Sequence, residues 1–331
     1  MLIPPKYILT SKISKLLSQI EAARSVIESV AIPQEVELNI RRHSTLRSSL
    51  YSARIEGNPL TLDNIGGRSS KDRKKIEVFN ILRALNILAK RTEKNIDAKD
   101  ILQLHNIVMD GLSPEKGIFR KEVSAIFNAS GMAIYMPPPP SMVAGYIERL
   151  LKFINSQQEQ FIPIRASLTH YMFEKIHPFL DGNGRVGRLL LQEVLYKNKY
   201  GMKGLLTIEQ YLDQHRSIYY RMLENTEKDV TDYVEFMLEA IVYTSEQAGK
   251  LVLEKKDGSG EDCLLPRRAE ILNIIKDHKV ISFDQIHRRF MAVNERTLRY
   301  DLKKLKDSGF IRKLGNTNGA YYEIKEYTPT L

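Results

Sequence analysis

The sequence predicts a mainly α-helical fold with one small β-hairpin, followed by a separate small domain of mixed pattern. Apolar residues recur at helical spacing through most of the 331 residues. A stretch rich in glycine and arginine interrupts that pattern, and a polar stretch with glycines precedes the last part of the chain. We therefore expect an N-terminal helical part, a core, a linker and a C-terminal domain: residues 1–62, 63–254, 255–265 and 266–331.

Two helices are expected before residue 62. Apolar residues at helical spacing predict the first over residues 6–32, and Pro33 interrupts it. The second runs from about Val36 to Glu56 and ends at Gly57. A carboxylate in the last helical turn opposes the helix dipole, so a solvated surface glutamate is the simpler interpretation of Glu56 from its position alone.

Residues 63–110 continue the helical pattern around a basic run. We interpret the run, residues 68–75, as a solvated loop rather than a nucleic-acid contact, and we expect a core helix around residues 81–88. His105 lies in an apolar background, and no histidine, cysteine or aspartate nearby has metal-site spacing. His105 is therefore expected to be a packing histidine.

A β-hairpin is predicted next. Two short β-like runs, residues 123–127 and 132–136, flank the turn sequence Asn128-Ala-Ser-Gly131, and prolines follow. Because a lone hairpin is marginal in water, this one should lean on the helices. Its open edge could pair with an extended peptide of a partner, and a purely structural hairpin is the alternative.

The stretch from Ile176 to Arg188 carries a histidine, a carboxylate, an amide, three glycines and two arginines between two helical patterns. Its proline and glycines predict a tight helix–loop–helix. Glycine N–H groups, the N-terminus of the second helix and the arginines all suit phosphate. Asp181 is a hard oxygen ligand for magnesium. Histidine is the only side chain in this stretch that ordinarily titrates near neutrality, which makes His177 the candidate general base.

Two other interpretations of this stretch fit less well. Residues 182–187 fit the dinucleotide fingerprint G-x-G-x-x-G, but that fingerprint must follow a strand and the preceding pattern is helical. A plain glycine-rich helix connection would require all these polar residues to converge by accident. Both interpretations are set aside.

Residues 177–188 resemble the Fic family, whose signature H-P-F-x-[D/E]-G-N-G-R-x-x-R they match at every fixed position. The family's usual reaction is transfer of AMP from ATP to a hydroxyl of a target protein. The resemblance implies that His177 is the base and that Asp181 binds Mg²⁺. It also implies nucleotide phosphate contacts by the amide, the glycine N–H groups and the arginines: Asn183, Gly182, Gly184, Gly187, Arg185 and Arg188.

A second motif adds an inhibitory role. The sequence from Ser52 through Glu56 to Gly57 matches the Fic inhibitory motif [S/T]-x-x-x-E-[G/N]. Its place before the signature is similar to the class with an N-terminal inhibitory helix. The resemblance implies that Glu56 pairs with Arg188 and fills the space that the γ-phosphate needs.

The resemblance also bears on the hairpin and on a later tyrosine cluster. It implies that the hairpin is a flap that holds the target backbone, through Ile134, Tyr135 and Met136. Tyr211, Tyr219 and Tyr220 fall in a helical segment predicted over residues 207–224. Tyr219 and Tyr220 are candidates to wall an adenine, and core packing explains these tyrosines equally well. A further apolar helix is expected over 229–254.

Residues 266–326 show the order helix, short strand, helix, helix and two strands around Gly315–Gly319. This order resembles the winged-helix variant of helix-turn-helix. Fourteen Lys and Arg against eight Asp and Glu give this segment a charge of +6, more than half of the chain's +10. Its third helix, with Arg296, Arg299 and Lys303, is expected to contact duplex DNA. A dimerisation or protein-docking module is the alternative.

The resemblance to Fic proteins therefore implies a protein adenylyltransferase that uses ATP and Mg²⁺, modifies a Ser, Thr or Tyr hydroxyl of a protein target or of the chain itself, and is inhibited by Glu56. Homodimer formation stays open. One cysteine, no signal-peptide pattern and no long apolar run predict a cytoplasmic protein without membrane contact. Two alternatives remain: a DNA-binding regulator whose core only senses nucleotide, and an enzyme that removes AMP with the help of Glu56.

Overall fold

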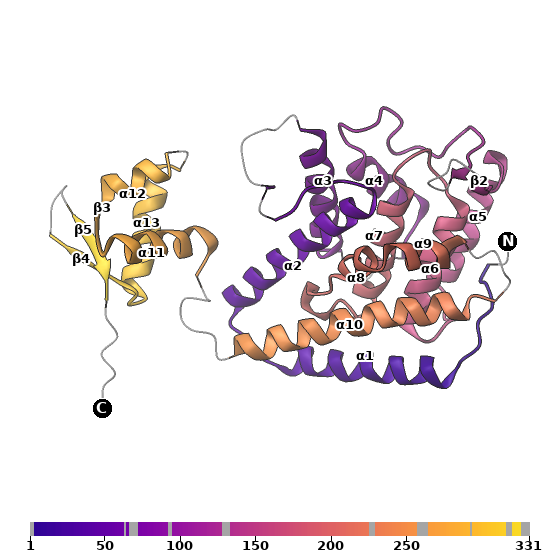
Figure 1. The fold of residues 1–331 in the computed structure, drawn as a ribbon, viewed down its shortest axis with the longest axis horizontal. Coiled ribbons are helices and arrows are strands. Elements are labelled where there is room, and N and C mark those ends of the chain that lie inside the picture. Colours follow the sequence, from indigo (N-terminus) through magenta and orange to yellow (C-terminus); the bar gives the residue numbers. More distant parts are fainter. Residues whose placement is uncertain are drawn as a thin grey trace. The chain divides into compact units, whose positions relative to one another are not determined.

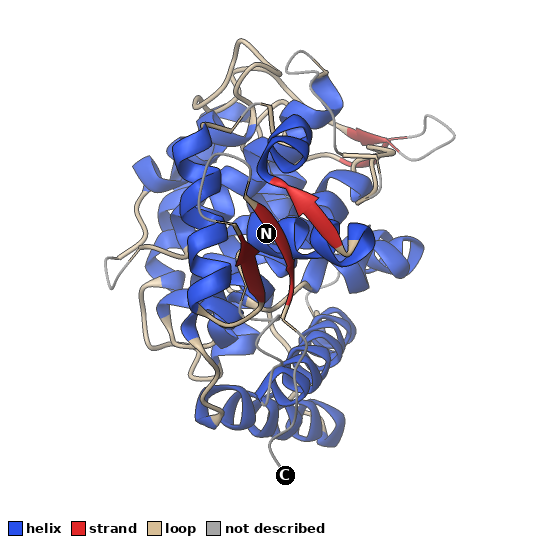
Figure 2. Cartoon of the chain, turned by 90° about the vertical axis from the view of Figure 1, so that its left-hand side faces the viewer, coloured by secondary structure: helices blue, strands red, loops and turns tan. Residues whose placement is uncertain are grey.

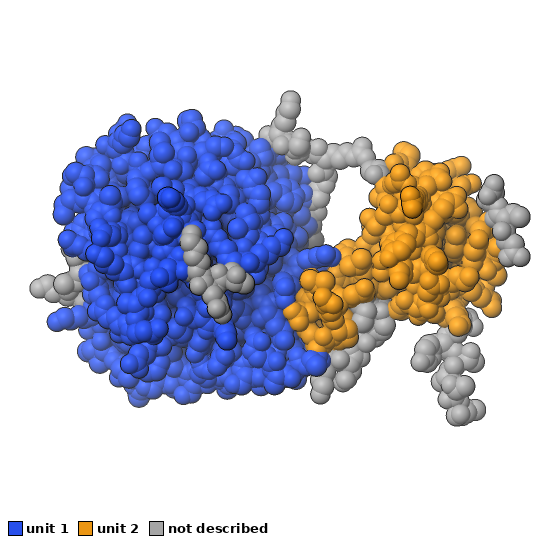
Figure 3. All heavy atoms as spheres, turned by 180° about the vertical axis from the view of Figure 1, so that it is seen from behind, with its two compact units in different colours: residues 1–31, 40–253 blue, residues 32–39, 254–331 orange. Residues whose placement is uncertain are grey.

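The fold is described from a computed structural model, which defines residues 3–62, 64–65, 72–91, 95–127, 133–224, 229–256, 264–291, 293–315 and 320–325; for Phe127, Ile134 and Lys256 only the backbone is described. The chain forms two compact units. One comprises residues 1–31 and 40–253, and the other comprises residues 32–39 and 254–331 (Figure 3). Each unit is described by itself.

The larger unit is a helical bundle. Its helices are α1 (Ser11–Ser29), most of α2 (Gln34–Ile55), α3 (Arg73–Leu88), α4 (Ala98–Val108), α5 (Pro140–Ile154), α6 (Ile162–Ile176), α7 (Asn183–Lys197), α8 (Ile208–Gln214), α9 (Arg216–Glu224) and α10 (Thr231–Lys256). A short 3-10 helix spans Met202–Gly204. Helices α6 and α7 lie in the middle of the bundle (Figure 1), and nearly all of their side chains are buried.

Helix α1 begins where the sequence offers a cap. The side chain of Thr10 accepts a hydrogen bond from the backbone N–H of Ile13, which satisfies one free donor at the helix start. The helix runs beside α10 (Figure 1), and Lys12 forms ion pairs with Glu235 and Glu239 of α10. The first and last helices of the bundle are therefore joined along their lengths.

The hairpin is shorter than predicted. Strand β1 (Ile126–Phe127) pairs antiparallel with β2 (Ala133–Tyr135), with an irregular register between the two residues of β1. The carbonyls of Glu122 and Pro138, which flank the strands, accept hydrogen bonds from the side chain of Arg120. Both residues lie outside the predicted runs, so these bonds hold the two ends of the hairpin without entering its ladder. The predicted turn, residues 128–131, and Met132 lie outside the described residues.

The prediction of one helical segment over residues 207–224 was wrong. The chain forms two helices, α8 and α9, that meet at His215. The ring Nδ1 of His215 lies 2.9 Å from the carbonyl oxygen of Tyr211, and the two rings stack. The backbone of His215, with φ of −114° and ψ of 33°, departs from the helical range, which separates the two helices. The break sets α9, which carries Tyr219 and Tyr220, at its own angle.

The smaller unit has the predicted winged-helix order. It contains α11 (Pro266–His278), β3 (Val280–Ser282), α12 (Phe283–Arg289), α13 (Glu295–Asp307), β4 (Ile311–Leu314) and β5 (Tyr321–Ile324). The strands form an antiparallel sheet in the order β3-β5-β4 (Figure 2, red). Residues 316–319 of the predicted wing, like Cys263 and residues 257–262 of the predicted linker, lie outside the described residues.

Side-chain caps explain where the two central helices of this unit begin. Ser282 and Gln285 form a reciprocal capping box at α12. Asn294 accepts from the backbone N–H of Arg296 at α13, as its position in the sequence suggested. Leucine, isoleucine and phenylalanine side chains from all three helices then form one apolar core with the sheet. Among the described residues of the whole chain, no helix is long and apolar enough to cross a membrane.

Candidate active site

The stretch that resembles the Fic signature joins α6 to α7. His177 is the C-cap of α6 and adopts a left-handed backbone conformation, with φ of 48°. Gly182 is the N-cap of α7 with φ of 82°, and a Cβ there would lie 2.8 Å from Sδ of Met109. Only glycine fits both this backbone angle and this space. The histidine and the start of α7 are thus set at the two ends of one short loop.

Four carbonyl groups of this loop have defined donors. Arg120 donates from Nε to the carbonyl of His177 (2.8 Å) and from its backbone N–H to that of Pro178 (2.9 Å). The amide of Asn183 bonds both the N–H and the carbonyl of Phe179. The fourth, the carbonyl of Asp181, is bonded by Nε2 of a histidine outside the loop, His105 (3.0 Å). The loop is thereby held in one conformation.

The prediction that His105 is a packing histidine is supported. Its Nδ1 accepts from the backbone N–H of Gly117, its Nε2 bonds Asp181, and its ring stacks on Phe179 at 3.7 Å. Burial lowers the pKa of His105 to about 4, so the ring stays neutral near pH 7. Its function is to hold the loop.

His177 is suited to accept a proton. Burial lowers its pKa to about 4, the backbone carbonyl of Glu174 opposes that lowering, and the charge of Arg120 adds to it. The imidazole is therefore neutral near pH 7. Its Nδ1 is buried and has no hydrogen-bond partner among the described residues. A neutral imidazole at the mouth of an anion site can act as general base.

The N-terminus of α7 has the features of an anion-binding site. The free N–H groups of its first turn and the helix dipole favour negative charge. Arg185 donates to Glu77 (2.7 Å) and to Asp181 (2.5 Å), and its side chain is buried. Asp181 keeps 66% of its side chain exposed. The resemblance implied that Asn183 contacts a nucleotide phosphate. In the structure the amide of Asn183 bonds the backbone of Phe179 instead, so this side chain shapes the loop.

Glu56 lies directly over this turn. Nη2 of Arg188 donates to Oε1 of Glu56 at 2.8 Å, and Arg188 also donates to the hydroxyl and the carbonyl of Ser52, both at 3.0 Å. A Cβ on Gly184 would lie 2.5 Å from Oε1 of Glu56. The carboxylate therefore fills space at the first turn of α7, where an anionic ligand would bind. This is the pair that the inhibitory motif implied.

The end of α2 delivers Glu56 to that position. Gly57 has φ of 91° and its N–H bonds the carbonyl of Arg54, which turns the chain out of the helix. Burial disfavours the charged form of Arg188, but the Glu56 carboxylate outweighs burial and raises the pKa of Arg188 above its ordinary value. Arg188 is thus a permanent cation held by a carboxylate that is itself 31% exposed.

The structure shows a buried carboxyl that the sequence analysis missed, that of Glu174 on α6. Oε1 of Glu174 has no hydrogen-bond partner in the described part of the chain and lies 3.8 Å from Nδ1 of His170. Burial raises the pKa of Glu174 to about 8 and lowers that of His170 to about 3. A Cβ on Gly187 would overlap Glu174, so packing accounts for this glycine. The sequence contained one signal for Glu174, because it is a polar residue three positions before His177 on a helix with a buried pattern.

The two candidate tyrosines differ. Tyr219 is 1% exposed, and its hydroxyl hydrogen-bonds to Nε2 of His170 at 2.8 Å, so core packing explains it. Tyr220 is 40% exposed and donates to the carbonyl of Ile55, the last residue of α2. Tyr220 therefore remains the better candidate for contact with a base, and it also touches the helix that carries Glu56.

The hairpin is attached to α6 through Tyr135. Its hydroxyl donates to the carbonyl of Lys175 at 2.8 Å, and Nζ of Lys175 lies 4.4 Å from the centre of its ring. Met136 is exposed after the strand, and the side chain of Ile134 lies outside the described residues. The open strand edge predicted for target docking remains a prediction.

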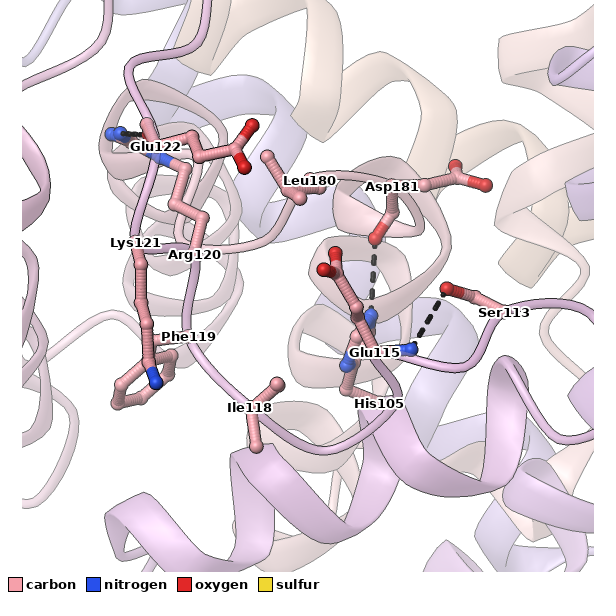
Figure 4. Close-up of a pocket in the computed structure, with 10 residues that line it drawn as sticks. All are labelled: His105, Ser113, Glu115, Ile118, Phe119, Arg120, Lys121, Glu122, Leu180 and Asp181. Atoms are coloured by element: carbon pink, nitrogen blue, oxygen red, sulfur yellow. Dashed lines mark hydrogen bonds between the residues drawn. The ribbon is translucent and has the colours of Figure 1, made fainter.

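A pocket of about 160 Å³ opens beside the loop (Figure 4). Its walls are the segment 113–122 and the pair Leu180–Asp181, and Arg120 and His105 contribute to its lining. In Figure 4 the carbonyl of Asp181 points toward His105 while its carboxylate points away from it. Oδ1 of that carboxylate accepts from Arg185 and from the N–H of Gly182, so Oδ2 is the oxygen that would meet a ligand.

The donor set at Asp181 fits magnesium. Within the described ranges, no group of three or more His, Cys, Asp or Glu side chains could hold a metal by themselves. Magnesium is commonly bound by one or two carboxylates together with substrate phosphates. A single exposed carboxylate beside an anion-binding helix end matches that arrangement.

In the smaller unit the predicted DNA-contacting residues Arg296, Arg299 and Lys303 are exposed on α13. The guanidinium of Arg299 lies 3.9 Å from the ring centre of Phe283 and 3.5 Å from Glu295. Asp301, on the buried face of the same helix, pairs with Arg267 and Arg268 of α11. One face of α13 is therefore anchored and the other presents positive charge.

Two family models match the chain. Residues 95–195 match the Fic/DOC family, and residues 269–326 match the Ribonuclease R winged-helix domain. The proteins named protein adenylyltransferase Fic from Drosophila mojavensis and Drosophila willistoni are 29% and 28% identical over 235 residues. These matches cover 67% of this chain and 44% and 45% of those relatives, so the chain spans less than half of their length.

Solved structures agree on the fold. A Fic family protein from Desulfovibrio desulfuricans G20 superposes with a TM-score of 0.67 at 24% identity, covering 98% of this chain and 99% of that one. Fic-1 from C. elegans, residues 134–508, gives a TM-score of 0.58 at 20% identity over 74% and 73% of the two chains. The helical bundle with its hairpin is thus a fold that Fic proteins share.

Proposed function

Because residues 95–195 of this chain form a Fic/DOC family domain, we propose that the protein transfers AMP from ATP to a Ser, Thr or Tyr hydroxyl of a protein target. The name of the matched relatives, protein adenylyltransferase Fic, supports this reaction. The observation that carries the proposal is the loop between α6 and α7. It places a neutral, buried histidine at one end and an anion-binding helix N-terminus with two buried arginines at the other.

In the proposed reaction, the oxygen of the target hydroxyl forms a bond to the α-phosphorus of ATP. The bond from that phosphorus to the oxygen bridging the β-phosphate breaks, and pyrophosphate leaves. His177 takes the hydroxyl proton. Its lowered pKa supports this role, because the ring is unprotonated at any pH well above 4.

The chain's other residues bind and orient the phosphates. The first turn of α7 and the guanidinium groups of Arg185 and Arg188 would bind the phosphate oxygens. Asp181 would hold Mg²⁺, which when bound neutralises charge on the phosphates. The loop bonds of Arg120 and His105 keep the histidine and this anion site at a fixed separation, which lowers the entropy cost of the reacting geometry.

We propose that the enzyme is autoinhibited by Glu56. The carboxylate occupies the first turn of α7 and pairs with Arg188, so a γ-phosphate would meet both negative charge and a guanidinium that is already bound. Removal of AMP from a modified target, with Glu56 orienting a water, is the alternative use of the same carboxylate.

The test is intact-protein mass spectrometry after incubation of the full chain with each nucleoside triphosphate and Mg²⁺. Both the wild-type chain and Glu56→Gly are used, the second because the wild type is expected to be inhibited. We expect addition of one or more AMP groups with ATP and none in His177→Ala. Addition in His177→Ala at the parental rate, or binding of ATP without any addition in Glu56→Gly, would contradict the proposal. The second outcome favours a regulator whose core only senses nucleotide.

A second function is proposed for the smaller unit, which is binding of duplex DNA through α13. The match to a winged-helix family and the exposed basic face of α13 support it. Protein docking or dimerisation through the same unit is the alternative. We also propose a cytoplasmic location for the protein, which the single cysteine predicts.

A further inference from the structure

We propose that Arg120 is a positioning residue that fixes the catalytic histidine and the target-docking hairpin in one register. This inference rests on the proposed AMP transfer, because it concerns how a target hydroxyl held by the hairpin reaches His177. Arg120 lies in the segment that leads into the hairpin and was not singled out in the sequence. It touches neither phosphate nor the reacting atoms as the site is proposed here.

The contacts of Arg120 join three parts of the chain. Its guanidinium donates from Nε to the carbonyl of His177 at 2.8 Å, from Nη1 to that of Glu122 at 2.9 Å, and from Nη2 to that of Pro138. Glu122 precedes β1 and Pro138 follows β2. Figure 4 shows the side chain of Arg120 turned toward Glu122. One planar group therefore ties both ends of the hairpin to the residue that carries the imidazole.

The backbone of Arg120 reinforces this link. Its N–H bonds the carbonyl of Pro178 at 2.9 Å, one residue after the histidine. Residue 120 thus holds two successive carbonyls of the loop at the point where His177 leaves the helix with φ of 48°. A left-handed backbone on a residue other than glycine persists only where its surroundings fix it, and Arg120 supplies two of the bonds that do so.

The burial of Arg120 argues against a simple surface role. The residue is 4% exposed, and none of the described carboxylates lies within ion-pairing distance. A charge buried without a counter-charge is costly, so net stability is a poor explanation for it. A lysine could not replace it, because a single ammonium lacks the planar fork that meets three separate carbonyls. The side chain is suited to geometry, and its charge also favours the neutral form of His177.

The hairpin has an independent attachment that makes a useful comparison. Tyr135 bonds the carbonyl of Lys175 and does not touch the histidine. Loss of that hydroxyl should weaken docking of a target without changing the histidine. Loss of Arg120 should do both. The two variants therefore separate a general loosening of the hairpin from misplacement of His177.

The experiment measures pyrophosphate released from ATP by the full chain carrying Glu56→Gly, with the chain itself as the acceptor probe. Adding Arg120→Gln is expected to lower the rate constant at least about tenfold, and by no more than the ~10²–10⁴-fold that the positioned base itself contributes. The dissociation constant for a non-hydrolysable ATP analogue should change less than about twofold. Lys121→Gln, the neighbouring exposed cation of the same segment, is the matched control and should leave the rate unchanged.

A double-mutant cycle with His177→Ala decides how Arg120 acts. If Arg120 works through the histidine, Arg120→Gln in the His177→Ala background lowers the rate no more than Tyr135→Phe does there, because only the loosening of the hairpin remains. Losses that multiply in the double variant, or a parental rate in Arg120→Gln, would overturn the proposal. Tyr135→Phe should also lower the rate, but its loss should persist in full in the His177→Ala background, because Tyr135 does not contact the histidine. Arg120→Lys replaces Arg120→Gln if the latter does not fold, and it is expected to remain at least severalfold slow.

Hydrogen exchange tests the positioning role of Arg120 independently of the proposed AMP transfer. If Glu56→Gly releases no pyrophosphate, the proposed transfer fails, but the positional claim is still measurable. Arg120→Gln should then speed amide exchange in residues 121–127, in 133–136 and at Phe179, while Lys121→Gln should not. Exchange that is unchanged in all three places would show that Arg120 does not hold this loop and hairpin together.

Discussion

The cations of the two units are used in different ways. In the larger unit Arg120, Arg185 and Arg188 are buried, and each has named partners at hydrogen-bond distance. In the smaller unit the candidate DNA-binding residues on α13, such as Arg296 and Lys303, are exposed to solvent. A buried, bonded arginine defines a position, whereas an exposed one contributes charge to a surface field. Single substitutions should therefore have large, specific effects in the first unit and small, salt-dependent effects in the second.

The largest effect is expected at the base itself. His177→Ala should lower AMP transfer by about 10²–10⁴-fold, because a positioned base typically contributes that much. The affinity for ATP should stay within about twofold, since the phosphate-binding groups lie on α7. Single-turnover transfer and equilibrium binding of an ATP analogue measure the two quantities. An equal loss of both would place the histidine in nucleotide binding instead.

The pH dependence of AMP transfer tests how burial affects His177. Because the folded-state pKa of His177 is lowered to about 4, its basic form is present above that value and is lost as pH falls through it. Transfer kcat/KM should thus stay nearly level from pH 8 to pH 5. A histidine with an ordinary pKa near 6.5 would lose about thirtyfold by pH 5. Circular dichroism at each pH confirms that the chain stays folded, and an inflection near 6.5 would contradict this role of burial.

The smallest effects are expected in the winged-helix unit. Reversing charge at Arg296 or Arg299 should weaken duplex DNA binding severalfold. It should also reduce the slope of log affinity against log salt by about one for each phosphate that α13 no longer neutralises. Lys15→Glu on α1 makes the same change in net charge in the other unit and should have less effect. Fluorescence anisotropy across a salt series measures both. Salt-independent binding, or none to any duplex, favours protein docking.

Much of the fold was predictable from local pattern. The helices, the winged-helix order and the cap at Asn294 follow from apolar spacing and capping residues that lie close together in sequence. The break at His215 was missed because no proline or glycine marks it in the sequence. The hairpin strands were overestimated because the alternation of residues does not show where a hydrogen-bonded ladder ends.

The site was predictable as a set of residues but not as a set of bonds. The signature placed His177, Asp181 and Arg188 together, and the short motif at Ser52 pointed to the contact that Glu56 makes. The bond from Arg120 to His177 spans 57 positions and has no local signal. Likewise, the role of Asn183 in holding Phe179 emerges only when both ends of the loop are in place.

We propose that Glu56 restrains AMP transfer by holding Arg188. Losing one partner of a desolvated charge pair commonly costs about 2–5 kcal/mol, and each ~1.4 kcal/mol is tenfold in an equilibrium. Freeing Arg188 for a phosphate should therefore raise the productive ATP-bound population by at least about tenfold. Glycine at 56 disturbs little else, because the helix already ends at Ile55.

The most direct measurement compares label incorporated per minute from α-labelled and γ-labelled ATP in wild type, Glu56→Gly, and Glu56→Gly with Arg188→Ala. We predict at least about tenfold more α-label in Glu56→Gly, no γ-label, and disappearance of the gain when Arg188 is also removed. Equal rates in wild type and Glu56→Gly would make Glu56 an ordinary surface residue. If Glu56→Gly instead no longer removed AMP from a modified target, the Glu56 carboxylate would be assigned to hydrolysis.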